Sequence, residues 1–551
     1  MSAAPSARLL IVATALAGAL LVHRAAAGEA NSELATPTWK NVAVAIAAPL
    51  EAWKADLARA GEPLATALAK KLQTRTGIQQ LTGIDRTRPA GVVLQTDGIN
   101  LAPVAFVPVT NAAALLQSIA PLVGEATPID ALPSGEAAEL WKIGRREWTG
   151  YVRRRGDWLY AAQTLALLED ASLPKLEAIL PAGRAAGEGD EPPDFSLRVY
   201  WQNMPEVLRT WAIDRVRQTM REAAEGESRP RLRQLYTSWF IERLLSDVDE
   251  VRLSWTYTAQ GAARLQASAS LLSDSPLGTF AVALAQPVNT EAFQQPVLTG
   301  QEVATVHVCV PPLEAARAKL AANAHSQIAT ITGAAIERPA PAEPCGFCDA
   351  VARLAGGHFQ ASLWWVGQRP PTQAVMATRG LEPDALRHLL AAAVNPGAAR
   401  ATQAADATLE VGRDGWLGRA IAPPGTDGGQ PLHVLLRENG TVCYALLSHD
   451  SRRLAQAIAD AQAVQGGNGK SRPLVDAVVR TGAALRLASM VAEDWQAKAN
   501  LGKVSLVVPP EKDRLHVTAA AADRTLRLRV EVDPGLTQAA GFGLALWLLA
   551  E

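Results

Sequence analysis

The chain has 551 residues, of which 48% are hydrophobic and 19% are charged. This ordinary globular composition excludes a polytopic membrane protein, a collagen and a disulfide-dense mini-scaffold. The 53 Lys and Arg residues nearly balance the 54 Asp and Glu residues, so the net charge does not favour nucleic acid as a partner. At this length the chain can bury a large core, and we expect three or four domains or two large ones.

Residues 1–27 have the pattern of a secretory signal peptide. One charge, at Arg8, precedes an apolar run of 14 residues from Leu9 to Val22, and Ala25-Ala26-Ala27 provides the small residues of a cleavage site. A spanning helix needs about 20 apolar residues, so the run favours cleavage over a short membrane anchor. We therefore expect a mature chain that begins at Gly28, is exported to the periplasm or the extracellular space, and has no transmembrane span.

Each half of the mature sequence begins with the same pair of elements. A strand-like segment at Val42–Ile46 leads into Pro49-Leu50-Glu51-Ala52, and a second at Val306–Val310 leads into Pro312-Leu313-Glu314-Ala315. In both places the Pro suits the first turn of a helix, where its missing N–H costs no hydrogen bond.

Further elements follow in the same order. A hairpin is predicted over Val92–Val109 around the turn Asp97-Gly98, and its counterpart spans Leu363–Ala377 around Pro370-Pro371. A short amphipathic helix with Leu115, Leu116 and Ile119 matches one with Leu386, Leu389 and Leu390. The strand after a Gly turn, Trp158–Tyr160, matches Val442–Tyr444, and the strand after a flexible linker, Leu197–Val199, matches Leu485–Leu487. The closing pair of long strands, Val251–Leu272, matches Val504–Val532.

This order predicts an α+β fold of two tandem pseudo-repeats, each a mostly antiparallel sheet with helices packed on one face. The predicted boundaries are 1–27 for the signal peptide, 28–300 for the first repeat, with a helical insertion near 214–249, and 301–551 for the second repeat. The alternative is that two unrelated α+β domains have a roughly similar order of helices and strands.

Motifs for nucleotide binding and catalysis are incomplete. Gly466–Ser471 resembles a phosphate-binding loop, but Val464 stands where the first Gly is required, and Gly541-Phe542-Gly543 lacks the third Gly of a dinucleotide fingerprint. The chain has no H-E-x-x-H, G-x-S-x-G or EF-hand motif. His449-Asp450 is either an oriented base or the polar end of a strand, and no nucleophile is marked for it. The sequence therefore predicts no catalytic or cofactor-binding residue.

The four cysteines all lie in the second half: Cys309, Cys345, Cys348 and Cys443. The C-x-x-C pair follows a Pro-rich loop, whereas thioredoxin-like pairs open a helix after a strand. Redox chemistry, a zinc site with Cys309, His307 or His358, and structural disulfides or buried thiols all remain open, and no metal ligand is assigned. Because export favours oxidation, we expect a Cys345–Cys348 bridge. A Cys309–Cys443 bridge is expected only if their strands are neighbours, since Cα atoms more than about 7 Å apart cannot be joined.

Aromatic and basic residues interleave in Trp141–Trp148 and Tyr151–Arg155. Such a surface could hold a polyanion or a glycan. The alternative is a hairpin with aromatic rings on one face and solvated Arg side chains on the other. Arg155-Gly156-Asp157 spells an adhesion tripeptide, but Gly-Asp is also a common turn.

The stretch from Leu81-Thr82-Gly83-Ile84-Asp85 through Arg88–Val93 to Phe106–Val109 resembles a group of uncharacterised secreted proteins that is widespread in planctomycete genomes. The resemblance covers mainly the beginning of the mature chain. It implies export and a duplicated α+β body, and it brings no catalytic residues.

A large, duplicated, exported chain with few motifs is expected to be a non-enzymatic envelope protein that binds a partner or builds structure. Its partner would be another envelope protein, a glycan or an apolar ligand. One alternative is a carrier that holds an apolar ligand in a groove between helices and sheet, marked by a contiguous apolar cavity. The other is a hydrolase whose site is assembled from distant residues, marked by a cleft with paired, pKa-perturbed groups.

Overall fold

The computed structural model describes residues 39–60, 81–130, 139–145, 148–180, 193–225, 232–286, 295–297, 301–309, 313–333, 358–366, 373–379, 410–411, 417–421, 432–439, 442–448, 462–464, 474–485 and 512–540, with residue 311 and a few positions between 66 and 74. The chain divides into two compact units. Unit 1 comprises Met1–Val216, Val248–Ser270 and Glu531–Glu551, and unit 2 comprises Arg217–Asp247 and Leu271–Val530. Both units combine helices with a large antiparallel sheet, so the fold class is α+β.

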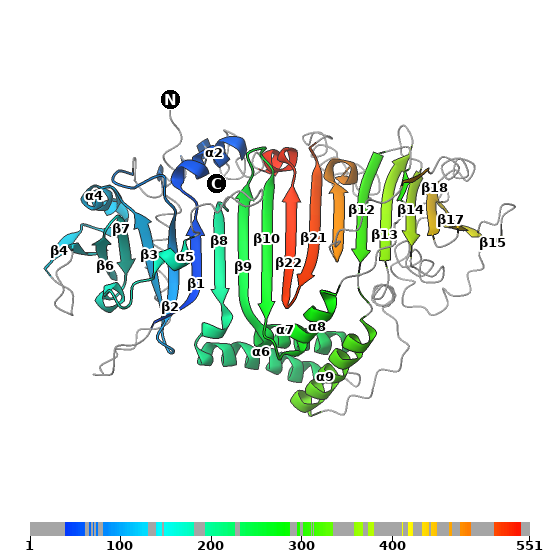
Figure 1. Ribbon diagram of the computed structural model, residues 1–551, viewed down its shortest axis with the longest axis horizontal. Helices are drawn as coiled ribbons and strands as arrows, with labels where there is room; N and C mark the ends of the chain where they lie inside the picture. Colours follow the sequence, from blue (N-terminus) through cyan, green and yellow to red (C-terminus); the bar gives the residue numbers. More distant parts are fainter. Residues whose placement is uncertain are drawn as a thin grey trace. The chain divides into compact units, whose positions relative to one another are not determined.

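Among its described residues, unit 1 contains ten strands, of which Figure 1 shows β8, β9 and β10 side by side. They pair in the order β10-β9-β8-β1-β2-β3-β7-β6-β5-β4, and the pairs from β9 to β4 are antiparallel. The strands are β1 (Lys40–Ala47), β2 (Ala90–Thr96), β3 (Leu101–Pro108), β4 (Thr127–Ile129), β5 (Glu139–Arg145), β6 (Trp148–Arg155), β7 (Trp158–Ala162), β8 (Phe195–Tyr200), β9 (Val248–Tyr257) and β10 (Ala263–Leu271).

The helical segments of unit 1 pack on both faces of its sheet. Ala105 and Val107 of β3 face a cluster with Leu115 and Leu116 of α4, whereas the alternate residue Phe106 faces a second cluster. The second cluster also contains the buried leucines of the short segments that follow β7. The helical elements that begin in this unit are α2 (Leu50–Ala60), α4 (Ala112–Val123), η2 (Leu165–Leu168), α5 (Leu176–Ile179), η3 (Trp201–Asn203) and α6 (Glu206–Glu225), which ends in unit 2.

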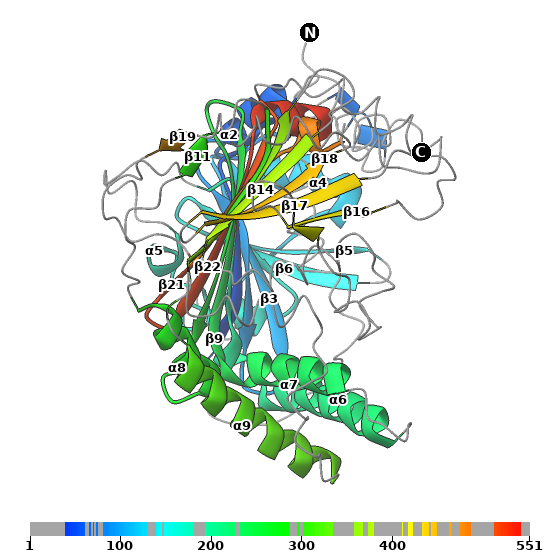
Figure 2. The same cartoon turned by 90° about the vertical axis from the view of Figure 1, so that its right-hand side faces the viewer.

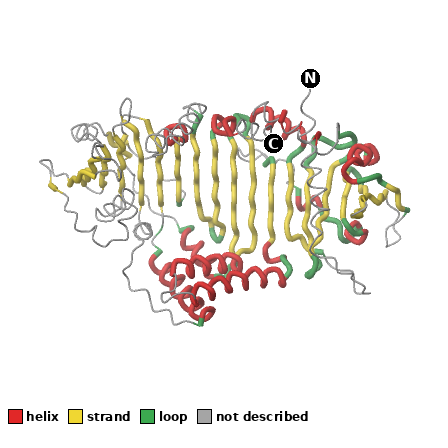
Figure 3. Tube along the Cα trace, turned by 180° about the vertical axis from the view of Figure 1, so that it is seen from behind, coloured by secondary structure: helices red, strands yellow, loops and turns green. Residues whose placement is uncertain are grey.

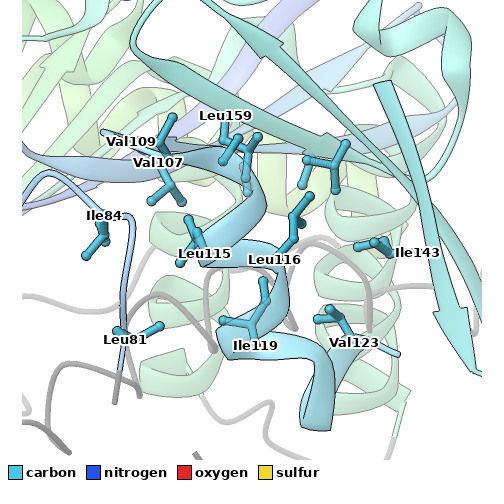
Figure 4. Close-up of a cluster of buried hydrophobic side chains, with 14 of the residues drawn as sticks. Leu81, Ile84, Val107, Val109, Leu115, Leu116, Ile119, Val123, Ile143 and Leu159 are labelled. Carbon is cyan, nitrogen blue, oxygen red and sulfur yellow. The ribbon is translucent and has the colours of Figure 1, made fainter. Parts of the chain in front are cut away.

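The prediction that helices pack on one face is therefore wrong for this sheet. The physical reason is visible in β3, where Val104 through Val107 are all buried. A strand buried on both faces reads as a continuous apolar run rather than an alternating one, and both of its faces need a cover. Figure 4 shows the larger cover, in which the α4 side chains point toward Val107, Val109 and Leu159. Each fully buried leucine of α4 contributes about 1.5–3 kcal/mol before entropy.

Ten of the described strands of unit 2 belong to one sheet. They pair in the order β22-β21-β20-β12-β13-β14-β18-β17-β16-β15, and the pairs from β21 to β15 are antiparallel. A separate two-stranded sheet joins β11 (Gln295–Val297) and β19 (Gln462–Val464). The large sheet consists of β12 (Gln301–Cys309), β13 (His358–Val366), β14 (Gln373–Arg379), β15 (Glu410–Val411), β16 (Leu417–Ile421), β17 (Leu432–Asn439), β18 (Val442–Ser448), β20 (Val475–Arg480), β21 (Arg514–Ala522) and β22 (Thr525–Val532).

Three helices of unit 2 pack together (Figure 2): α7 (Leu232–Asp247), α8 (Pro276–Leu284) and α9 (Glu314–Thr332). The helix α8 begins as expected for its sequence, because Ser275 caps its first turn by accepting a hydrogen bond from the Gly278 N–H and Pro276 follows directly. The Asp247 carboxylate at the end of α7 accepts a second hydrogen bond from this turn, from the Leu277 N–H at 3.1 Å.

The strand that follows the second linker is β20, at Val475–Arg480, whereas Leu485 lies in a helix over residues 481–485, so the match of Leu197–Val199 with Leu485–Leu487 is wrong. The predicted helix with Leu386, Leu389 and Leu390 lies outside the described residues. The hairpin around Asp97-Gly98 is confirmed, with Val92 opposite Ala105.

Candidate functional site

The aromatic and basic residues of the predicted surface patch lie on the hairpin of β5 and β6. Trp141 and Trp148 are half-buried and pack against the α4 side of the core. Arg153 is buried, contrary to the expectation that the Arg side chains of this hairpin are solvated. Its Nη1 donates to the Leu168 carbonyl oxygen at 2.5 Å, and its Nη2 lies 3.0 Å from the Asp170 carboxylate. Arg153 therefore ties the η2 segment to the sheet and is not presented to a ligand.

Arg154 and Arg155 of the patch also have acidic partners. Arg154 pairs with Glu139 at 3.2 Å, and Arg155 pairs with Asp170 at 3.4 Å. Asp157 pairs with Arg88 at 3.2 Å, and the Arg88 guanidinium lies 4.3 Å from the centre of the Trp158 ring. Gly156, at φ 58°, forms the turn between β6 and β7. Both charged residues of the tripeptide are thus engaged within unit 1, and this arrangement favours the structural interpretation of the patch.

A second surface of unit 1 has a more distinctive character. Three apolar cross-strand pairs share one face of β8 and β9: Phe195 with Trp255, Leu197 with Leu253, and Val199 with Val251. We call these six residues the Trp255 face. Trp255 has 38% and Val251 has 37% of its surface exposed, and the other four residues are half-buried. On the adjoining strand β1, Ala43, Ala45 and Ala47 stand opposite the three β8 residues, so no large side chain flanks them there.

The opposite face of the same strands is charged. Arg198 forms a two-point ion pair with Glu250, with nitrogen–oxygen distances of 2.5 and 2.9 Å, and Arg252 also contacts this carboxylate. Burial acts to raise the pKa of Glu250, but the hydrogen bonds from Arg198 and Arg252 outweigh it and lower the pKa below its usual value. The Arg198 guanidinium lies 4.6 Å from the centre of the Tyr200 ring. The strands β8 and β9 are therefore amphipathic, with one charged and one apolar face.

In unit 2, polar residues gather on one face of the central strands. His307 of β12 stands opposite Asp476 of β20. The Asp476 carboxylate lies 2.6 Å from Nε2 of His516 on β21, and both side chains are more than a third exposed. Sequence reasoning missed this histidine–aspartate pair because the two residues are 40 positions apart. The only sequence signal was that all mature histidines lie in the second half.

Several predicted site residues lie outside the described residues. They are Cys345 and Cys348, the His449-Asp450 pair, the Gly466–Ser471 segment and the Gly541–Gly543 segment. The Cys309–Cys443 prediction required neighbouring strands, and this condition is not met. Cys309 is in β12 and Cys443 in β18, with β13 and β14 between them. At about 4.8 Å per strand their backbones are about 14 Å apart, beyond the limit of about 7 Å for a disulfide.

Among the side chains that the structure describes, no three His, Cys, Asp or Glu residues come close enough to hold a metal ion. In the same part of the chain, no helix combines the length and the apolar character needed to cross a membrane. Comparisons with protein-family models, with curated proteins and with solved structures find no match for this chain.

Proposed function

We propose that this protein is an exported, non-enzymatic protein of the cell envelope that binds an apolar partner through the Trp255 face. The observation that carries this proposal is the exposure of Trp255 and Val251 on a regular two-stranded ladder of apolar pairs. Single exposed apolar residues are common on protein surfaces, but contiguous ones mark sites of association. Trp is also among the residue types most enriched at the energetic centre of interfaces.

The charged opposite face supports a one-sided interaction. Glu250 with Arg198 and Arg252 gives that side of β8 and β9 an ionic surface that is satisfied internally. An apolar partner would gain little there and would gain most on the Trp255 face, where burial contributes about 25 cal/mol per Å² of apolar area. The partner is therefore an apolar segment of another envelope protein or an apolar small molecule.

Export is part of the proposal, and its support is the sequence pattern of residues 1–27. N-terminal sequencing of the protein from its native host should give Gly28 as the first residue. An intact Met1 on the mature protein would contradict export by this signal.

A tandem duplication is also part of the proposal. Its main support is that the strands of the two units pair in the same order when β12, β13, β14, β18 and β20 are matched with β1, β2, β3, β7 and β8. A second support is a shared irregularity. The pairing of β1 with β2 shifts register between Asn41 and Ala43, and that of β12 with β13 shifts between Glu302 and Ala304. Bulges are retained features of related sheets rather than accidents.

The binding proposal is tested by replacing Trp255 with a photo-crosslinking phenylalanine analogue in the native host. Irradiation should give a discrete adduct, and its mass separates a protein partner from a small apolar ligand. Ile99 is the matched control because it is apolar, 80% exposed and located in the turn between β2 and β3. If both positions give the same adducts, or if position 255 gives none, the Trp255 face is not the binding surface.

A further inference from the structure

We infer that the charged face of β8 and β9 binds an acidic polysaccharide through the guanidinium groups of Arg198 and Arg252. This surface lies on the opposite side of the two strands from the Trp255 face, and its residues belong to unit 1. An acidic sugar polymer is therefore a second partner, in addition to the apolar one proposed above.

Strand pairing places two arginines directly opposite each other. Arg198 of β8 is the cross-strand partner of Arg252 of β9, and like charges in this position destabilise a sheet. Glu250 offsets the repulsion, because its carboxylate accepts hydrogen bonds from Nε and Nη2 of both guanidinium groups. Arg198 alone contacts both carboxylate oxygens, at 2.5 and 2.9 Å. The sheet therefore does not need the second arginine to hold Glu250.

Arg198, Arg252 and Glu250 together carry one net positive charge. The carboxylate is satisfied within the sheet, but it neutralises only one of the two guanidinium groups. On the neighbouring strand β10, Arg264 pairs with Glu531 at 2.7 Å, so this pair adds no net charge. The excess charge is accessible, since 40% of the Arg198 side chain and 59% of the Arg252 side chain are exposed, against 12% for Glu250.

The geometry of the arginine pair suits an oxyanion. A guanidinium group has five N–H donors in one plane and binds carboxylate, sulfate or phosphate oxygens two at a time. Because the Nε–Nη2 edge of Arg252 faces Glu250, its Nη1 side is the one that can take a second oxyanion. The Arg198 guanidinium lies 4.6 Å from the centre of the Tyr200 ring, which restricts its position.

Neutral polar side chains continue the same face. Ser196 and Ser254 form the next cross-strand pair on this side, and Ser254 Oγ lies 3.5 Å from Oε1 of Gln266 on β10. Hydroxyl and amide groups both donate and accept hydrogen bonds, as sugar hydroxyls do. One excess charge is too small for nucleic acid, whose binding depends on many phosphate contacts. A cationic pair beside hydroxyl groups therefore favours a sugar polymer with carboxylate or sulfate groups.

The test is a binding titration of the full mature chain with three acidic oligomers of similar length and charge. Oligogalacturonate presents carboxylates on sugars, a sulfated dextran oligomer presents sulfates on sugars, and oligoglutamate presents carboxylates on a peptide. Neutral dextran is the uncharged control. At low ionic strength at least one acidic sugar should bind more tightly than oligoglutamate, and the sugar that binds identifies the anion.

Three variants assign the binding to the arginine pair. Arg252→Gln removes the excess charge and leaves the Arg198–Glu250 ion pair, so it should weaken binding at least about tenfold, as for loss of a hydrogen bond to a charged group. Glu250→Gln removes the internal carboxylate that competes for both arginines and should strengthen binding, which a purely structural ion pair would not do. Arg154→Gln makes the same change of charge on β6, where Arg154 pairs with Glu139, and should leave the affinity unchanged.

Circular dichroism checks that each variant is folded, and either Arg252→Gln or Glu250→Gln alone decides the test. The inference is wrong if neither acidic sugar binds, if oligoglutamate binds as tightly as the sugars, or if Arg252→Gln and Arg154→Gln lose affinity equally. Unchanged or weaker binding in Glu250→Gln would also contradict it. Failure of these titrations would leave the crosslinking result at Trp255 unaffected.

Discussion

Two acidic residues show how the immediate surroundings of a side chain decide its chemistry. Glu250 meets two guanidinium groups, and its pKa lies below the usual value although burial opposes this shift. Asp247 is almost fully buried, and its nearest guanidinium nitrogen, on Arg243, is 3.7 Å away. Burial raises the pKa of Asp247 above its usual value, because the hydrogen bond from Leu277 and the charge of Arg243 only partly offset the lost hydration.

This difference predicts a pH-dependent effect of Asp247→Asn. A carboxyl group with a raised pKa in the folded state stabilises the fold below its unfolded pKa of about 3.9, and that stabilisation is lost as the pH rises through the folded pKa. The free energy of unfolding of the wild type, relative to Asp247→Asn, should therefore fall as the pH is raised from about 4 toward neutrality. Urea unfolding at several pH values measures this difference.

Two further variants delimit the effect. Asp247→Ala removes the acceptor for the Leu277 N–H and should cost about 1–3 kcal/mol at all pH values, because it leaves a buried donor without its partner. Asp249→Asn changes the same residue type at an exposed position and controls for the change in net charge. A pH-independent difference for Asp247→Asn would show that burial does not govern this carboxyl group.

At the scale of elements, the connection from residue 83 to α4 depends on a close approach between the backbone at Gly83 and the Asn111 carbonyl oxygen. Gly83 has φ +76°, and its carbonyl oxygen accepts hydrogen bonds from the Thr110 and Asn111 N–H groups at 2.9 and 3.0 Å. A Cβ atom at this position would lie 2.1 Å from the Asn111 carbonyl oxygen. Asn111 caps α4, so a shift of its backbone would disturb the packing of the helix on the sheet.

We therefore predict different costs for Gly83→Ala and Gly98→Ala. Gly98 also has a positive φ, of +102°, but a Cβ atom there would meet no atom within 4 Å. Both variants carry the backbone strain, of about 1 kcal/mol, and only Gly83→Ala adds a clash with backbone atoms. Thermal unfolding should show a loss of at least about 2 kcal/mol more for Gly83→Ala. Equal losses would mean that the α4 connection adjusts without cost.

At the scale of the whole molecule, each compact unit contains a helix from the other half of the sequence. In unit 2, α7 and α8 come from the first half and pack with α9 from the second, where Tyr236 Oη lies 2.8 Å from His325 Nδ1 and Trp239 donates to Gln327 at 2.9 Å. In unit 1, the helix over residues 534–540 comes from the end of the chain. Its Thr537 accepts a hydrogen bond from Tyr257 at 3.2 Å and donates to the Gly261 carbonyl oxygen at 2.9 Å.

This exchange predicts that the chain stays assembled after it is cut. A specific protease site placed between residues 286 and 295 separates α8 from β11 in the sequence but leaves α7, α8 and the helix over residues 534–540 in place. The cleaved protein should elute as one species with the mass of the uncleaved chain. Trp239 is buried, so Trp239→Ala should cost about 3–5 kcal/mol and release the fragments after cleavage. Two cleaved fragments that separate and each unfold cooperatively would contradict the prediction.

Local features of the sequence determined individual elements. The Asp97-Gly98 turn specified the hairpin of β2 and β3, and the stripe of Leu115, Leu116 and Ile119 specified the buried face of α4. The strands that Figure 3 shows in yellow were mostly predicted near their positions, because alternation and turn residues act over a few neighbouring positions. Leu485 was misplaced because a short apolar segment suits a strand and a buried helix equally well.

Only the tertiary structure decided which elements are neighbours. Strand order put β13 and β14 between Cys309 and Cys443, and it put Cys309 opposite His358. It also buried Arg153 against the Leu168 carbonyl, where sequence alternation had indicated a solvated residue. Propensity and periodicity are properties of short segments, whereas strand pairing and burial depend on contacts between segments tens to hundreds of residues apart. Most helices and strands of this protein could therefore be predicted from its sequence, whereas the surfaces that they form together could not.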